Sequence, residues 1–160
     1  MPPRVVPLNI EIANLDLAEL LSEWRWLVPG DYTAIQMTKF GDWFFADSMG
    51  RVFFLDLIEG NLCQVASSVA EYNQLKNTPD KQSSWFLDGL VFRCDSEGLL
   101  LREGECYGWK VHPTIGGKFE SANIQTFSLR VYQSLMGQLL RQWKQLKPGD
   151  PIPQIQITDT

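Results

Sequence analysis

Cys106 and His112 are the two residues of this sequence with the chemistry of a nucleophile and its general base. Both lie in the glycine-rich stretch 104–123, where a turn would bring them together. A catalytic triad also recruits a third member and an oxyanion hole from elsewhere, and no further pattern identifies them. The alternative is a buried, inert thiol and a surface histidine beside Pro113. We favour this alternative and predict that the protein is not an enzyme.

A second pattern, Gly116-Gly117 followed by Lys118, resembles part of a phosphate-binding loop. Such a loop continues into a helix through Lys-Ser or Lys-Thr, whereas Lys118 is followed by Phe119. A backbone turn that needs positive φ explains the two glycines without a ligand. The sequence therefore predicts no cofactor at this loop.

Acidic side chains mark the turns of a predicted sheet: Asp42, Asp47, Asp56 and Glu59. Asp is a favoured turn residue, so one interpretation is ordinary solvated turn side chains. A second is an anionic patch for a basic protein partner. A third, a divalent-cation site, lacks the D-x-D-x-D-G pattern of a calcium loop, and we predict no metal. All four residues remain candidates for partner binding.

Trp26 is a further candidate for partner binding. A helical stripe of Leu20, Trp24 and Leu27 predicts the buried face of the first helix, and Trp26 points about 200° away from it. A partly exposed Trp is a suitable interface anchor. Partial exposure at a helix end is also common for this residue.

The chain is acidic and rich in apolar residues. It has 160 residues, 44% of them hydrophobic, with a net charge of −5 and a pI near 4.8. This balance argues against direct nucleic-acid binding, which needs clustered Lys and Arg. No apolar run is long enough to span a membrane, and the first residues do not resemble a signal peptide. The 3 cysteines are widely spaced, which does not indicate a disulfide framework. We expect a cytoplasmic protein.

Hydrophobic periodicity predicts an α+β fold, an antiparallel β-meander packed with helices. Aromatic residues on both faces of the strands predict a sheet covered on both sides. The expected elements are a helix over 17–27, strands over 32–40, 43–46, 51–55 and 61–65, helices over 69–76 and 79–90, a short strand over 107–111 and a long amphipathic helix over 129–146. We expect one domain over 1–147, followed by an extended tail over 148–160.

Three stretches of the chain, taken in order and spacing, resemble a bacterial domain family long labelled only as a domain of unknown function. This family includes the C-terminal domain of immunity proteins that neutralise a DNase effector of type VI secretion. The resemblance covers about 32–146. The family loop usually reads Pro-Pro where this chain has His112-Pro113, and its last helix often carries a histidine near Tyr132 or Gln133. The stretches are Gly41 to Phe44 with Gly50 to Asp56 and Gly60; Gly104 to Phe119 with Asn123; and Val131 to Leu139.

The most specific part of the resemblance is the family-motif loop, with its members Gly104, Cys106, Tyr107, Lys110, Pro113, Gly116 and Gly117. The resemblance implies a non-enzymatic protein-binding domain that neutralises a nuclease toxin, and it supplies no catalytic residues. An acidic binder is suited to the basic surface that a nuclease displays for its substrate. The alternative is a housekeeping or regulatory module that binds a protein, or a small ligand near 104–117.

Overall fold

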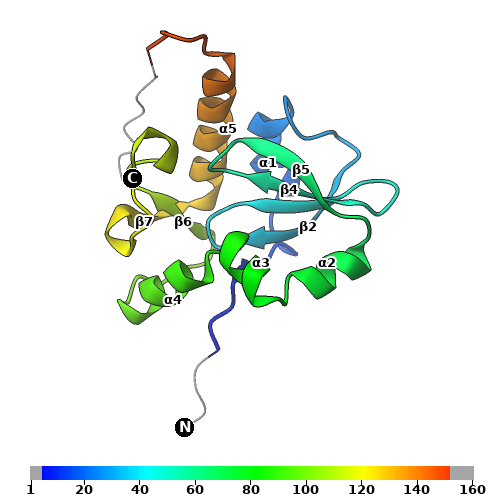
Figure 1. Ribbon diagram of the computed structural model, residues 1–160, viewed down its shortest axis with the longest axis horizontal. Helices are drawn as coiled ribbons and strands as arrows, with labels where there is room; N and C mark the ends of the chain where they lie inside the picture. The colour runs from blue at the N-terminus through cyan, green and yellow to red at the C-terminus, as the bar shows by residue number, and fades with distance from the viewer. Residues whose placement is uncertain (1–4, 152–160) are drawn as a thin grey trace.

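The main sheet has five antiparallel strands in the spatial order β1-β2-β3-β4-β5 (Figure 1). The computed structural model describes residues 5–151. The predicted meander is confirmed, and β1 adds an edge strand that the sequence pattern did not indicate. The strands are β1 Asn9–Ile10, β2 Thr33–Thr38, β3 Trp43–Ala46, β4 Val52–Asp56 and β5 Asn61–Ala66.

Both faces of this sheet are buried, as the aromatic pattern predicts. Because side chains alternate along a strand, Trp43 and Phe45 of β3 face one core cluster while Phe44 between them faces another. The Trp43 side is covered by α1 Leu17–Leu20, the 3-10 helix η1 Ser22–Trp24 and α5 Leu129–Gln145. The Phe44 side is covered by α2 Val69–Leu75 (Figure 1). The side chains of Trp85 and Phe86, which follow α3, complete this cover.

Two of the expected helices are interrupted. The helix predicted over 17–27 is the short pair α1 and η1, and the Asp16 carboxylate caps α1 by accepting from the Glu19 N–H. The helix predicted over 79–90 is split by Leu87, whose φ of 51° is left-handed. The first half buries no side chain of its own, although Trp85 and Phe86 directly after it are buried beside Phe44, and the second half buries Val91 and Cys94 in another core cluster. The chain changes direction between the two halves. They are α3 Pro79–Ser84 and α4 Asp88–Ser96.

A second, two-stranded sheet precedes the last helix. Its strands are β6 Glu105–Trp109 and β7 Ile124–Ser128, joined by a loop with the 3-10 helices η2 Pro113–Ile115 and η3 Ser121–Asn123. The expected strand over 107–111 begins earlier, and β7 was not predicted. Its buried side chains, Ile124 and Phe127, do not alternate strictly, which conceals the period of a strand.

The last helix, α5, is the element that ties the fold together. Ser128 caps it by accepting from the Val131 N–H. From this helix, Gln133 is fully buried. Its Oε1 accepts hydrogen bonds from the indole N–H groups of Trp24 (3.1 Å) and Trp43 (2.9 Å), and its Nε2 donates to a backbone carbonyl in the turn before β3 (2.7 Å). One amide therefore joins α5, η1 and the sheet.

Two further expectations from the sequence concern the C-terminal tail and membrane-spanning segments. The extended tail expected over 148–160 lies outside the described residues from 152 onward. Within the part of the chain that the structure describes, no helix is both long and apolar enough to cross a membrane.

Candidate partner-binding surface

The turn after β4 and the loop after β6 are fastened together at one residue, Leu57. Its N–H donates to Asp42 Oδ1 (2.8 Å), and its carbonyl oxygen accepts from His112 Nε2 (3.1 Å). Next to it, Thr114 Oγ1 donates to the carbonyl oxygen of Ile58 (3.0 Å). The turn 56–60 and the loop 110–119 consequently form one continuous face, which we call the loop–turn surface.

Asp42 supports this surface from inside and is not part of an exposed patch. Its carboxylate is buried, and its second oxygen accepts from Thr38 Oγ1 (2.9 Å). Burial, with a smaller contribution from the nearby Asp56 carboxylate, raises the pKa of Asp42 to about 7. The expectation of a solvated or partner-facing Asp42 is therefore wrong, because its side chain turns inward to pair with the Leu57 N–H.

His112 is buried as well, contrary to the expectation of a surface histidine. Its Nδ1 accepts from the Thr114 N–H (3.2 Å), which leaves the proton on Nε2 for the bond to Leu57. Burial lowers the pKa of His112, opposed by the Leu57 bond and by the Asp56 and Glu59 carboxylates. The neutral ring therefore has a structural role, since its hydrogen bonds hold the loop against the turn.

Cys106 and His112 do not form a nucleophile–base pair. The thiol is fully buried in the core cluster with Trp43 and Tyr132, and burial raises its pKa well above the usual value. The hydrogen bonds of the His112 ring go to Leu57 and Thr114 instead. A protonated thiol in an apolar core is not a nucleophile. The interpretation of Cys106 as a buried thiol fits this position.

The loop of the loop–turn surface has a tightly fixed backbone. Asn123 Oδ1 accepts from the Val111 N–H (2.9 Å), while its Nδ2 donates to the carbonyls of Val111 (2.8 Å) and Lys118 (3.0 Å). Gly117 lies so close to the backbone at Val111 that an added Cβ would stand 1.7 Å from the Val111 oxygen. Gly116 has a φ of 100°, which favours glycine. The geometry of the turn accounts for both glycines.

The other members of the family-motif loop divide between scaffold and surface. Tyr107 is buried, and its hydroxyl donates to the Leu99 carbonyl. Pro113 opens η2 at its first position, and Gly104 has a φ of 78° before β6. Lys110 is exposed. Most of the motif therefore shapes the loop, and Lys110 is its member available to a partner.

The remaining acidic candidates lie at opposite ends of the sheet, because successive antiparallel turns alternate ends. The Asp47 carboxylate, in the turn before β4, accepts hydrogen bonds from the backbone N–H groups of Met49 and Arg51 and from Arg51 Nε (2.7 Å). Asp56 is half-buried and Glu59 is exposed, and both belong to the loop–turn surface. The expectation of one patch formed by all four carboxylates is wrong, since only these last two share a face.

Trp26 is half-buried after η1, in line with the partial exposure expected of it. Its ring stacks on Trp24 with centroids 6.2 Å apart. Its indole N–H is buried without a hydrogen-bond partner. These contacts make it part of the wall of the core, on a different element from the loop–turn surface.

Sequence reasoning missed the apolar side chains that this loop exposes. Val111, Ile115 and Phe119 are 47%, 41% and 53% exposed. Their spacing matches neither a helix nor a strand, so periodicity gives no indication of them. The available signal was the presence of large apolar residues inside a glycine-rich loop, where solvent exposure is the rule.

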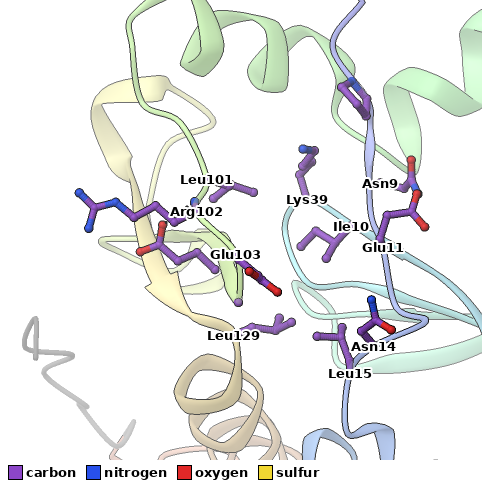
Figure 2. Close-up of a pocket in the computed structure, with 13 residues that line it drawn as sticks. Asn9, Ile10, Glu11, Asn14, Leu15, Lys39, Leu101, Arg102, Glu103 and Leu129 are labelled. Atoms are coloured by element: carbon purple, nitrogen blue, oxygen red, sulfur yellow. Dashed lines mark hydrogen bonds between the residues drawn. The ribbon is translucent and has the colours of Figure 1, made fainter.

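A separate cleft of about 370 Å³ lies between the N-terminal segment and the start of β6 (Figure 2). Ile10 and Leu15 on one wall face Leu101 and Leu129 on the other, with the Lys39 side chain beside them (Figure 2). Burial lowers the pKa of Lys39, partly opposed by the Asp95 carboxylate. Across residues 5–151, no three His, Cys, Asp or Glu side chains are placed to hold a metal ion.

Comparisons with known proteins agree with the resemblance noted from the sequence. Residues 66–140, just under half of the chain, match the family described as T6SS immunity protein Tdi1, C-terminal. No curated protein matches the chain. A solved structure, "Crystal structure of Atu4351 from Agrobacterium tumefaciens", is 16% identical with a TM-score of 0.45. The structural alignment covers 75% of this chain and 63% of that chain.

Proposed function

We propose that this protein is a non-enzymatic immunity protein that neutralises a toxin of type VI secretion by binding it. The observation that carries the proposal is the family match over 66–140. That stretch contains the whole loop 110–119, whose backbone is fixed and whose apolar side chains are exposed. Binding, and not turnover, is the activity for which such a surface is suited.

The toxin in this proposal is a nuclease. Nucleases present cationic surface to their substrate, and a chain with a net charge of −5 is attracted to such a surface at long range. Asp56 and Glu59 supply the local negative charge on the loop–turn surface. The contribution expected from Asp42 and Asp47 is removed, because one is buried and the other is paired with Arg51.

Calorimetry with a type VI secretion nuclease toxin from the same genome, in a catalytically inactivated form, tests the proposal. We expect a 1:1 complex whose affinity falls as salt is raised, since exposed charges are screened. In parallel, co-expression with the active toxin should protect cells. Failure to bind would overturn the immunity function, whereas binding that is indifferent to salt would overturn only its electrostatic part.

The non-enzymatic part of the proposal has its own test. The residues with nucleophile and base chemistry, Cys106 and His112, are both engaged in structure. Cys106→Ala should therefore leave toxin neutralisation unchanged when the variant is folded, as monitored by circular dichroism. Loss of neutralisation by a folded Cys106→Ala protein with normal toxin affinity would point to a catalytic role.

The cleft in Figure 2 favours a second candidate function, binding of a small ligand next to Gly104. Its apolar walls and the charged side chains Lys39, Glu11 and Glu105 among its lining residues are suited to a zwitterionic ligand such as an amino acid or short peptide. Ligand-observed NMR with the common amino acids and dipeptides tests it. Saturation transfer that disappears in Ile10→Asp supports this candidate, and no transfer from any of them excludes it.

A further inference from the structure

The loop 110–119 concentrates exposed apolar surface that the fold does not use. We call Val111, Ile115 and Phe119 the apolar ridge. Of the three, Val111 lines a shallow hollow of about 290 Å³, together with Gly116, Gly117, Lys118 and neighbouring residues. The other large exposed apolar side chains in the described part are dispersed over separate elements: Val5, Met49, Val69, Phe92, Leu100 and Val131. Single exposed apolar side chains are ordinary, whereas a cluster on one loop is not.

The ridge is held rigid before any partner arrives. Asn123 fixes the backbone at Val111 and Lys118, and the N–H groups of Ile115 and Gly117 both donate to the His112 carbonyl. From beneath, His112 is itself bonded to Leu57. The Phe119 ring rests edge-on against Trp109, with centroids 5.2 Å apart. A preformed loop loses little conformational entropy on binding, which favours affinity.

Charged side chains around the ridge indicate what it would meet. Lys110 and Lys118 are exposed on the loop, and neither forms an ion pair within the described residues. Glu120 borders the hollow. On the far side of His112, the turn contributes Asp56 and Glu59. Exposed apolar side chains and two lysines thus share the loop, whereas Asp56 and Glu59 belong to the turn that His112 and Thr114 hold against it.

We propose that the apolar ridge is the docking surface for the toxin, and that the toxin offers an apolar pocket bordered by carboxylates on the loop side. The toxin's cationic region then lies over Asp56 and Glu59. This inference rests on the proposed immunity function and adds the surface and the chemistry of the partner. An apolar centre inside a charged rim is the common anatomy of a specific protein interface.

The test measures affinity for the inactivated toxin by calorimetry. Phe119→Ser and Ile115→Ser should each weaken binding at least tenfold, as expected for central anchors. Met49→Ser, at the opposite end of the sheet, and Val69→Ser, on α2, remove comparably exposed apolar side chains and should leave affinity within twofold. Thermal midpoints close to that of the unmodified protein would show that every variant is folded.

Charge reversal tests the chemistry of the partner. Lys118→Glu should weaken binding severalfold at low salt and less at high salt, whereas Arg141→Glu on α5 should have little effect. Unchanged affinity in folded Phe119→Ser and Ile115→Ser proteins would overturn the docking surface while the immunity function stands. Tighter binding by Lys118→Glu would overturn the carboxylate-bordered pocket. An unmodified protein that fails to bind the toxin would overturn both proposals.

Discussion

Asp42 and His112 hold opposite ends of the same residue: the carboxylate accepts the N–H of Leu57, and the imidazole donates to its carbonyl. Neither side chain is close to Leu57 in the sequence. The pair fixes the turn 56–60 against the loop 110–119, and with it the orientation of the surface proposed to bind the toxin. Two titratable groups thus serve as fixed hydrogen-bonding supports.

Removing the imidazole should loosen this support. His112→Ala leaves the buried Leu57 carbonyl without its donor and the Thr114 N–H without its acceptor. We expect the free energy of unfolding to fall by about 1–3 kcal/mol, measured by urea denaturation. Thr114→Val, which removes only the exposed bond to Ile58, should cost less. Equal losses in the two variants would contradict the central role of His112.

The buried carboxylate of Asp42 should make stability depend on pH. Its folded pKa of about 7 lies above the ordinary value of 3.8, so the folded state holds the proton more tightly than the unfolded state. The contribution of Asp42 is fully present below pH 4 and is lost as pH rises towards 7. Asp42→Asn carries no titrating proton and should lack this loss. As pH rises from 4 to 8, the unfolding free energy of the unmodified protein should therefore fall relative to that of the Asp42→Asn variant.

His112 acts in the opposite direction, and this provides an internal control. Because its pKa is lowered on folding, its contribution is present above about pH 6.5 and is lost as pH falls below that value. The comparison of His112→Ala with the unmodified protein should show the largest difference at neutral pH. A pH profile of Asp42→Asn identical in shape to that of the unmodified protein would contradict the account of the buried carboxylate.

Gln133 should be among the most sensitive positions of the chain. Gln133→Leu leaves two buried indole N–H groups and one carbonyl unpaired, so we expect a loss of about 3 kcal/mol or more in unfolding free energy. Gln138→Ala, on the exposed side of the same helix, should change it by less than about 0.5 kcal/mol. Chemical denaturation measures both. A near-neutral Gln133→Leu would mean that the indole groups find other partners.

Gly117 should be intolerant of even one carbon. Gly117→Ala places a Cβ 1.7 Å from the Val111 oxygen, so the loop must shift and toxin affinity should fall together with stability. Gly89→Ala in α4 meets nothing within 4 Å and should be neutral or stabilising by up to about 1 kcal/mol. Thermal unfolding and calorimetry compare the two. Normal toxin affinity in the Gly117→Ala variant would show that binding does not depend on the conformation of this loop.

Local chemistry predicted much of this fold. Alternating aromatic residues around Trp43 specify both faces of a strand, and Ser68 followed by Glu71 marks a helix start with its own hydrogen bonds. Long-range contacts determined the rest. In the sequence, Asp42 has the pattern of a turn residue. Its role as a buried hydrogen-bond acceptor depends on the Leu57 N–H, which is 15 residues away. The carbonyl that His112 binds is 55 residues away, so no local pattern reveals its role.

The hydrogen bonds of Gln133 also indicate which part of the chain is structurally self-sufficient. The family match begins at residue 66, yet both indoles that this amide serves, Trp24 and Trp43, precede that point. The stretch 66–140 therefore does not contain the hydrogen-bond donors of its own buried amide oxygen. A transplanted copy would carry a buried amide whose acceptor oxygen has lost both donors, and its new host would have to supply indoles at the same places.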